Sequence, residues 1–132
     1  MKDLKALFFY DFYEDRIADV IKESFVDHIY DGLIKKNMVA VEVGANIGVF
    51  TLMAYPFASK IYALEPSKQH FDTFMQMLTF NKMLDKVIPI NKALSNETGK
   101  AVFYHNKNTT SYSLSDAVDN TGEKEEVEMI TF

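Results

Sequence analysis

Residues 39–51 read VAVEVGANIGVFT, and this stretch decides the fold. Its first part, 39–43, is rich in β-branched valine and predicts a short buried strand. The small residues from Gly44 to Gly48 predict a tight turn, because glycine has no Cβ and tolerates positive φ. The apolar residues after the turn predict a helix. A strand, a glycine turn and a helix in this order bring the backbone close to a ligand.

A second apolar run, IYALEP at 61–66, carries an acidic residue where it ends. Glu65 is expected at the carboxyl end of the neighbouring parallel strand, where a ribose could donate both hydroxyls to its carboxylate. Two plainer interpretations stay open. Gly44 and Gly48 could be turn glycines without a ligand, and Glu65 could serve the start of a helix that Pro66 introduces.

Two classes of ligand use this geometry. A dinucleotide needs the spacing G-x-G-x-x-G, which lets helix amides receive a pyrophosphate. Here the glycines are spaced as Gly44-x-x-x-Gly48, and Glu42 stands inside the strand before the turn. A carboxylate there repels pyrophosphate but suits the cationic end of a phosphate-free nucleoside such as S-adenosylmethionine (SAM). Because a buried unpaired carboxylate is costly, Glu42 is expected to bind a ligand or join a polar network.

Three segments carry a resemblance to a known family: VEVGANIGVFT at 41–51, ALEPSKQHFDTFMQMLTFN at 63–81 and VIPINKALSNETGKAVFY at 87–104. They resemble the FkbM-like family of SAM-dependent methyltransferases, from about Met38 to the end of the chain. The resemblance implies a Rossmann-like, doubly wound α/β fold with SAM as the cofactor. It also implies transfer of the sulfonium methyl group to an oxygen of a small-molecule or sugar acceptor.

The resemblance implies cofactor contacts at the ends of the first two strands and after the third. The residues expected to bind the cofactor are Glu42, Gly44, Ala45, Asn46, Gly48, Glu65, Pro66 and Ala93. The two glycines and Ala45 would contact the methionine part through their backbone, and Glu42 and Asn46 would contact its polar end. Glu65 would accept from the ribose diol, and Ala93 would lie against the adenine ring. No catalytic residue is assigned.

The order of the predicted elements defines the sheet. Strands are expected at 38–43, 60–64 and 87–91, and helices at 47–55 and 67–83. Pro89 lies in the third strand and predicts an edge position, because proline cannot donate to a ladder. Right-handed crossovers then give a parallel sheet in the order 3-2-1, which is the first half of a doubly wound sheet.

Two further segments flank this half-sheet. Apolar residues at helical spacing predict a helix at 14–31, so residues 1–37 are expected to form a helical lead-in to a SAM-binding half-domain at 38–132. After the third strand, strands at 101–105 and 125–132 predict a β-hairpin-like extension around a polar loop at 106–122. The fourth parallel strand of the family is expected beyond residue 132. We therefore expect the chain as given to be truncated before this strand, either as a fragment or as a reduced form of the fold, and to be inactive.

Composition narrows the classes of function. The chain has 132 residues, 48% of them hydrophobic, which is enough for one packed domain. The formal net charge of −5 disfavours nucleic acid as a partner. No apolar run reaches the length of a membrane span, so no membrane partner is expected. The absence of cysteine excludes disulfides and thiolate metal sites and fits a cytoplasmic location. The histidines lack ligand spacing, so no metal site is predicted.

Two alternatives from other classes stay open. The first is a non-catalytic nucleoside-binding or interaction module, in which a partner stabilises the half-sheet. That partner could be a second copy of the chain, paired through the open sheet edge. The second is an NAD-dependent oxidoreductase, which the glycine spacing and Glu42 disfavour. Comparing the binding of SAM and NAD would separate these readings.

Overall fold

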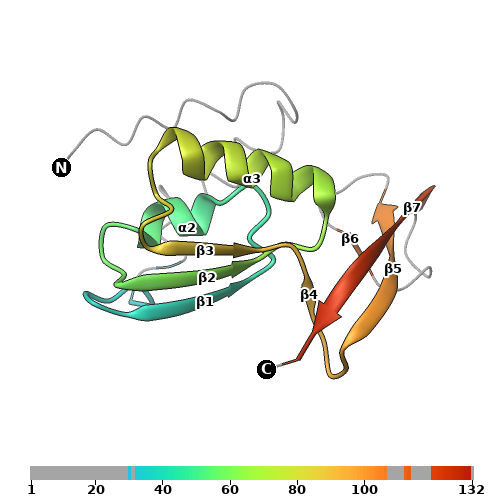
Figure 1. The fold of residues 1–132 in the computed structure, drawn as a ribbon, viewed down its shortest axis with the longest axis horizontal. Coiled ribbons are helices and arrows are strands. Elements are labelled where there is room, and N and C mark those ends of the chain that lie inside the picture. Colours follow the sequence, from blue (N-terminus) through green and yellow to red (C-terminus); the bar gives the residue numbers. More distant parts are fainter. Residues whose placement is uncertain (1–29, 31, 107–111, 114–119, 132) are drawn as a thin grey trace.

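The computed structural model describes residue 30 and residues 32–106, 112–113 and 120–131. They form a parallel sheet with two helices and a second, mostly antiparallel sheet. In Figure 1 the second sheet lies beyond the carboxyl ends of the parallel strands. The helix expected at 14–31 lies outside the described residues except for Tyr30, which is in a turn.

The parallel sheet has the predicted strands in the predicted order. β1 (Val39–Val43), β2 (Lys60–Leu64) and β3 (Val87–Ile90) pair in the order β1-β2-β3, with every pair parallel. This confirms the Rossmann-like half-sheet. Within the part of the chain that the structure describes, β3 forms one edge, as Pro89 predicts, because its missing N–H is tolerated where no further strand pairs. Among the described residues, β1 forms the other edge.

Both helices lie on one side of this sheet (Figure 1). α2 (Val49–Ala54) connects β1 to β2, and α3 (Lys68–Phe80) connects β2 to β3. The predicted helix at 67–83 ends earlier than expected, because Lys82 adopts a φ of 56° and reverses the chain. This reversal turns Met83 back into the core, where it is fully buried.

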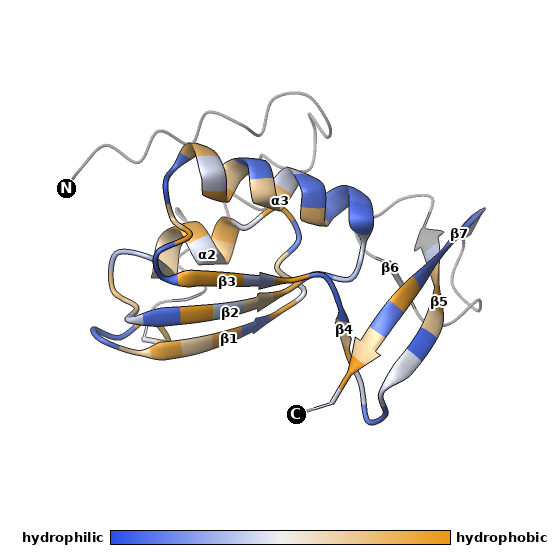
Figure 2. Ribbon diagram, viewed as in Figure 1, coloured by the Kyte–Doolittle hydropathy of each residue, from blue (hydrophilic) through white to orange (hydrophobic). Residues whose placement is uncertain are grey.

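The core fills the space between the sheet and the helices. The buried residues that form it are Ala45, Leu52, Ala54, Ala58, Ile61, Ala63, Phe74, Met77, Leu78, Met83 and Val87. Because side chains alternate along a strand, the other face of β1 points away from the helices. There Val41 and Val43 are 47% and 57% exposed. Figure 2 shows that this strand is largely apolar. The sheet therefore has one covered face and one apolar face that the described residues leave exposed.

The second sheet is the predicted hairpin with two additional strands. β5 (Gly99–Asn106) and β7 (Asn120–Ile130) pair antiparallel, which confirms the hairpin-like extension. β4 (Ala93–Leu94) pairs parallel with β7, and β6 (Tyr112–Ser113) pairs with β5. The prediction of a loop over all of 106–122 was therefore wrong at Asn106, Tyr112–Ser113 and residues 120–122, because cross-strand pairing outweighs polar composition. Residues 107–111 and 114–119 lie outside the described residues.

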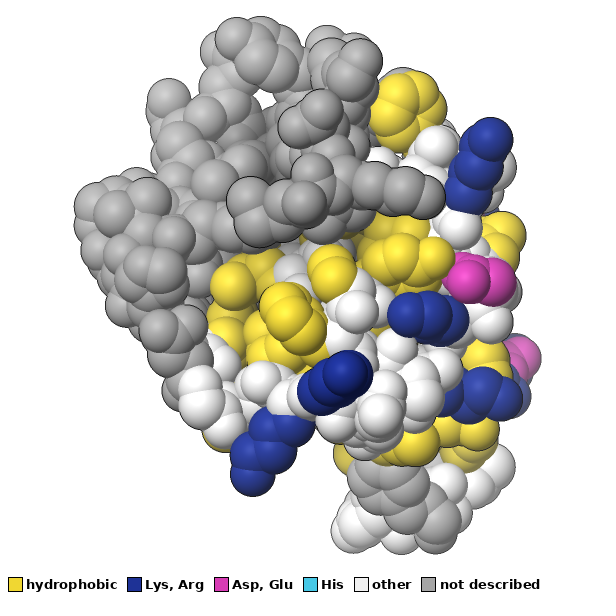
Figure 3. Space-filling view, turned by 90° about the vertical axis from the view of Figure 1, so that its left-hand side faces the viewer, with side chains coloured by type: hydrophobic (Ala, Val, Ile, Leu, Met, Phe, Trp, Pro, Cys, Tyr) yellow, Lys and Arg dark blue, Asp and Glu magenta, His cyan; other side chains and the backbone are white. Residues whose placement is uncertain are grey.

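The end of the molecule where the parallel strands begin differs from the end where they finish. Figure 3 looks onto the left-hand side of Figure 1, where β1, β2 and β3 begin, and shows hydrophobic and lysine side chains. Phe57 and Leu84, in the loops that lead into β2 and β3, are among the exposed hydrophobic residues. The buried carboxylate Glu65 lies at the opposite end of the sheet, directly after β2.

Candidate functional site at the carboxyl ends of the parallel strands

The turn after β1 is tied to the end of β2. Gly44 and Ala45 both donate their N–H to the carbonyl oxygen of Leu64, at 2.9 and 2.8 Å. Gly44 and Asn46 have positive φ angles of 79° and 52°. A Cβ added at Gly44 would meet no atom within 4 Å, so glycine is required there by the backbone and leaves open space in front of the turn.

Glu65 joins the turn to the start of α3. Its side chain is buried, with 4% of the residue exposed. One carboxylate oxygen accepts the Asn46 N–H at 2.8 Å, and the other accepts the Ser67 N–H at 2.9 Å. His70 Nδ1 lies 3.9 Å from the same carboxylate. Burial raises the pKa of Glu65 above its ordinary value of 4.5, against the two backbone donors that lower it. Glu65 therefore also serves the start of α3, which is one of the interpretations that the sequence left open.

Glu42 makes a polar contact on the face of the sheet that the helices cover. It pairs in register with the buried Ala63 of β2, and the Thr51 hydroxyl of α2 donates a short hydrogen bond to its carboxylate. Burial raises the pKa of Glu42 to about 7, although the hydrogen bonds from Thr51 lower it. Glu42 is thus part of a polar network, which is one of its two predicted roles. Its contact with a ligand stays a prediction.

Gly48 is needed for the packing of α2 on α3. Its φ is 95°, and an added Cβ would overlap Met77 and lie 2.6 Å from a ring carbon of Phe74. Both of these residues belong to α3. The space on the Cβ side of Gly48 is thus filled by α3, and the predicted contact of its backbone with a ligand stays a prediction. This glycine lets the start of α2 pack closely on the neighbouring helix.

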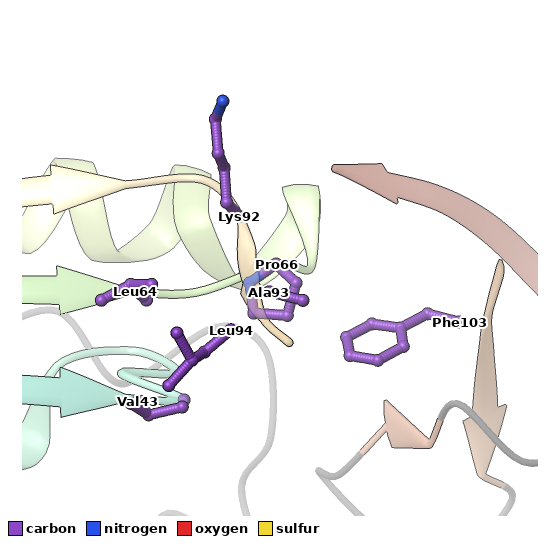
Figure 4. Close-up of a pocket in the computed structure, with 8 residues that line it drawn as sticks. Val43, Leu64, Pro66, Lys92, Ala93, Leu94 and Phe103 are labelled. Carbon is purple, nitrogen blue, oxygen red and sulfur yellow. The ribbon is translucent and has the colours of Figure 1, made fainter. Parts of the chain in front are cut away.

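A small pocket opens where the two sheets meet (Figure 4). Its volume is about 170 Å³. The residues that line it come from the ends of β1 and β2 and from the second sheet: Val43, Gly44, Leu64, Pro66, Lys92, Ala93, Leu94 and Phe103. All of them except Lys92 are apolar or glycine, and in Figure 4 the amino group of Lys92 points away from the other labelled side chains. Small-molecule sites usually exceed about 300 Å³, so this pocket suits one apolar part of a ligand.

Asn91 supports the site from the end of β3. Its side-chain amide donates to the carbonyl oxygens of Glu65 and Pro66, at 2.7 and 3.0 Å. These two hydrogen bonds hold the segment that carries the Glu65 carboxylate. The sequence placed Asn91 at the end of the third predicted strand but gave no sign of this contact, because its partners are distant in sequence.

No family model and no curated protein matches the chain. Among solved structures, it is similar to precorrin 8w decarboxylase from Methanobacterium thermoautotrophicum, with 28% identity over 44% of this chain and 31% of that chain and a TM-score of 0.41.

Two other solved structures are similar over limited parts of their length. A candidate methyltransferase from Streptococcus mutans, in complex with SAH, is 22% identical over 46% of this chain and 34% of that chain, with a TM-score of 0.42. Trm5b from Pyrococcus abyssi is 17% identical over 67% of this chain and 28% of that chain, with a TM-score of 0.45. The chain thus spans about a third of the length of these proteins.

The structure brings some of the predicted cofactor residues together. Gly44, Pro66 and Ala93 line the pocket. Glu42, Ala45, Asn46, Gly48 and Glu65 do not line it. Sequence reasoning missed Phe103 as a pocket residue. Its only signal was an apolar residue in a predicted strand, and such a pattern does not tell which surface the side chain meets.

Two other kinds of site are absent from the described part of the chain. No group of His, Asp and Glu there could hold a metal ion. None of its helices is long and apolar enough to cross a membrane.

Proposed function

We propose that the chain is a SAM-dependent methyltransferase domain similar to the FkbM-like family, and that it binds the cofactor at the carboxyl ends of β1 and β2. One arrangement carries this proposal. The Glu65 carboxylate lies against the turn after β1, and an apolar pocket opens nearby at Gly44 and Pro66. A carboxylate close to an apolar pocket suits a nucleoside, because ribose hydroxyls need an acceptor and the base needs an apolar seat.

In this proposal the residues of the chain bind and orient the cofactor. Glu65 has lone pairs beyond the two that accept backbone N–H groups, and these would accept the ribose hydroxyls. The open space before Gly44 would take the methionine part, with Ala45 and Asn46 beside it. Glu42 would add negative charge near its cationic end, and Pro66 and Ala93 would contact the adenine. Gly48 would also contact the methionine part through its backbone, as the resemblance implies.

The chemistry of the proposed reaction needs little from these residues beyond position. SAM supplies a methyl group on a positively charged sulfur, which an acceptor oxygen can displace. We propose an oxygen of a small molecule or sugar as the acceptor. Holding two reactants in line accounts for most of the rate gain in such a displacement. We therefore assign no catalytic base.

A dinucleotide fits this turn poorly. A pyrophosphate is bound by free backbone N–H groups at a helix N-terminus. Here the Asn46 N–H already donates to Glu65, and the N–H groups of Gly44 and Ala45 donate to Leu64. The negative charge of Glu65 would also oppose a phosphate at this place. SAM, which has no phosphate, avoids both conflicts.

The exposed apolar face of β1 favours a second proposal, an interaction module. Val41 and Val43 lie on this face, and β1 is an edge strand among the described residues. An edge strand with apolar side chains can pair with another chain. We propose that a second copy associates there, with or without methyl transfer.

Titration calorimetry with SAM, SAH and NAD tests the proposed function. We expect SAM and SAH to bind, and NAD to bind at least roughly tenfold more weakly, because the N–H groups of Gly44, Ala45 and Asn46 are already engaged. Tighter binding of NAD would overturn the assignment, as would no heat with any of the three ligands.

Two variants locate the binding site. Glu65→Gln replaces a charged acceptor, so SAH binding should weaken by roughly tenfold or more. Glu97→Gln is the matched control, because Glu97 is an exposed loop residue outside the pocket. Circular dichroism checks that both variants fold. Unchanged affinity in the Glu65 variant would remove this carboxylate from the site.

A further inference from the structure

One wall of the pocket belongs to the second sheet. Phe103 of β5 lines the pocket together with Pro66 and Ala93. Figure 4 shows its ring pointing toward these two residues from the strand on the opposite side. The pocket is therefore not a property of the parallel sheet alone, since it is closed by a side chain from the hairpin.

The hairpin is held in this position by its inner face. Phe103 pairs in register with Glu125 of β7, and a carboxylate oxygen of Glu125 accepts the N–H of Lys68 at the start of α3, at 3.3 Å. Further along the same face, Val127 and Met129 are buried against Ala93. Two neighbouring residues of the hairpin thus lie against the first part of the fold, Phe103 at the pocket and Glu125 at the start of α3.

The walls of the pocket suit a flat ring. The ring of Phe103 faces apolar groups from Pro66 and Ala93, and the amino group of Lys92 points elsewhere. An aromatic side chain attracts another aromatic ring by stacking or edge contact, beyond simple burial of area. A flexible aliphatic or charged ligand part would gain less from these walls.

We propose that Phe103 determines ligand specificity by contacting a flat heteroaromatic ring, so that the hairpin is part of the binding site. This inference rests on the proposed function, in which the ring is the adenine of SAM or SAH. A ligand held between Phe103 and Pro66 contacts both sheets. Its binding therefore fastens the hairpin to the carboxyl ends of the parallel strands.

Calorimetry with SAH compares two neighbouring substitutions. Phe103→Leu keeps an apolar side chain against Ala93 but removes the ring, and SAH binding should weaken by roughly tenfold, in the range of a lost aromatic contact. Val102→Ala is the control, because Val102 is the adjacent residue on the opposite face and is 43% exposed. Its affinity should equal that of the wild type. Thermal melting shows whether each variant is folded.

Hydrogen exchange of the wild-type chain supplies a measurement without any substitution. Saturating SAH should slow exchange at backbone amides of 99–104 in β5, and this result decides the matter if Phe103→Leu does not fold. Unchanged exchange in β5 would overturn the inference, and so would a folded Phe103→Leu variant that binds SAH as the wild type does. A wild-type chain that binds no SAH would overturn the proposed function, and this inference with it.

Discussion

Replacing Glu42 by glutamine should make the chain more stable at neutral and alkaline pH. The carboxylate of Glu42 lies under α2, where burial raises its pKa to about 7. Glutamine has nearly the same shape and keeps an oxygen that can accept the Thr51 hydroxyl. Glu42→Gln therefore removes the cost of a buried charge and keeps the hydrogen bond.

The size and sign of the effect come from the pKa shift. In the unfolded chain Glu42 has its ordinary pKa of 4.5, so between pH 4.5 and about 7 the folded state binds more protons than the unfolded state. The stability due to Glu42 is complete below pH 4.5 and is lost as the pH rises through about 7. At about 1.4 kcal/mol per pH unit, a shift from 4.5 to about 7 corresponds to up to about 3 kcal/mol at pH 8.

Urea unfolding followed by circular dichroism at pH 5, 6, 7 and 8 measures this effect. The wild type should lose stability across the series, and Glu42→Gln should lose markedly less. Glu128→Gln is the control, because the ion pair with Lys92 lowers the pKa of Glu128, which therefore titrates below this range. Equal pH dependence in the wild type and in Glu42→Gln would refute a buried, titrating Glu42.

The remaining predictions concern the turn and the exposed sheet face. Gly48→Ala should destabilise the chain by about 3 kcal/mol or more in urea unfolding, because overpacking against Phe74 adds to backbone strain. Gly44→Ala should lower the free energy of unfolding by only about 1–2 kcal/mol, since the added Cβ strains the backbone but meets no atom. Equal losses of stability in the two variants would contradict the packing role of Gly48. Val41→Lys should weaken self-association by roughly tenfold or more in sedimentation velocity, because a charge on an edge strand opposes pairing. Val102→Lys, on the outer face of β5, should leave self-association unchanged. A wild-type chain that stays monomeric at high concentration would argue against this interface.

The parallel half of the fold was predictable because its signals are local. The valines at 39–43 favour an extended strand, and the glycine turn after them ends it. Pro89 placed β3 at an edge through the chemistry of a single residue. The hairpin was also predictable, because β-forming residues cluster at 101–105 and again from Val127 onward. The pairing of β4 with β7 was not, since two residues carry no pattern and their partners lie far along the chain.

The candidate site, like the fold, was predictable only in part. The sequence by itself determined that a glycine turn and an acidic residue meet at the carboxyl ends of neighbouring strands, because strand order and the position of Glu65 follow from local patterns. Only the tertiary structure decided what each residue does there. It gave Glu65 two backbone donors, turned Gly48 toward α3 and placed Phe103 across the pocket. These roles depend on contacts between elements distant in sequence, and such contacts are set by packing rather than by local preference.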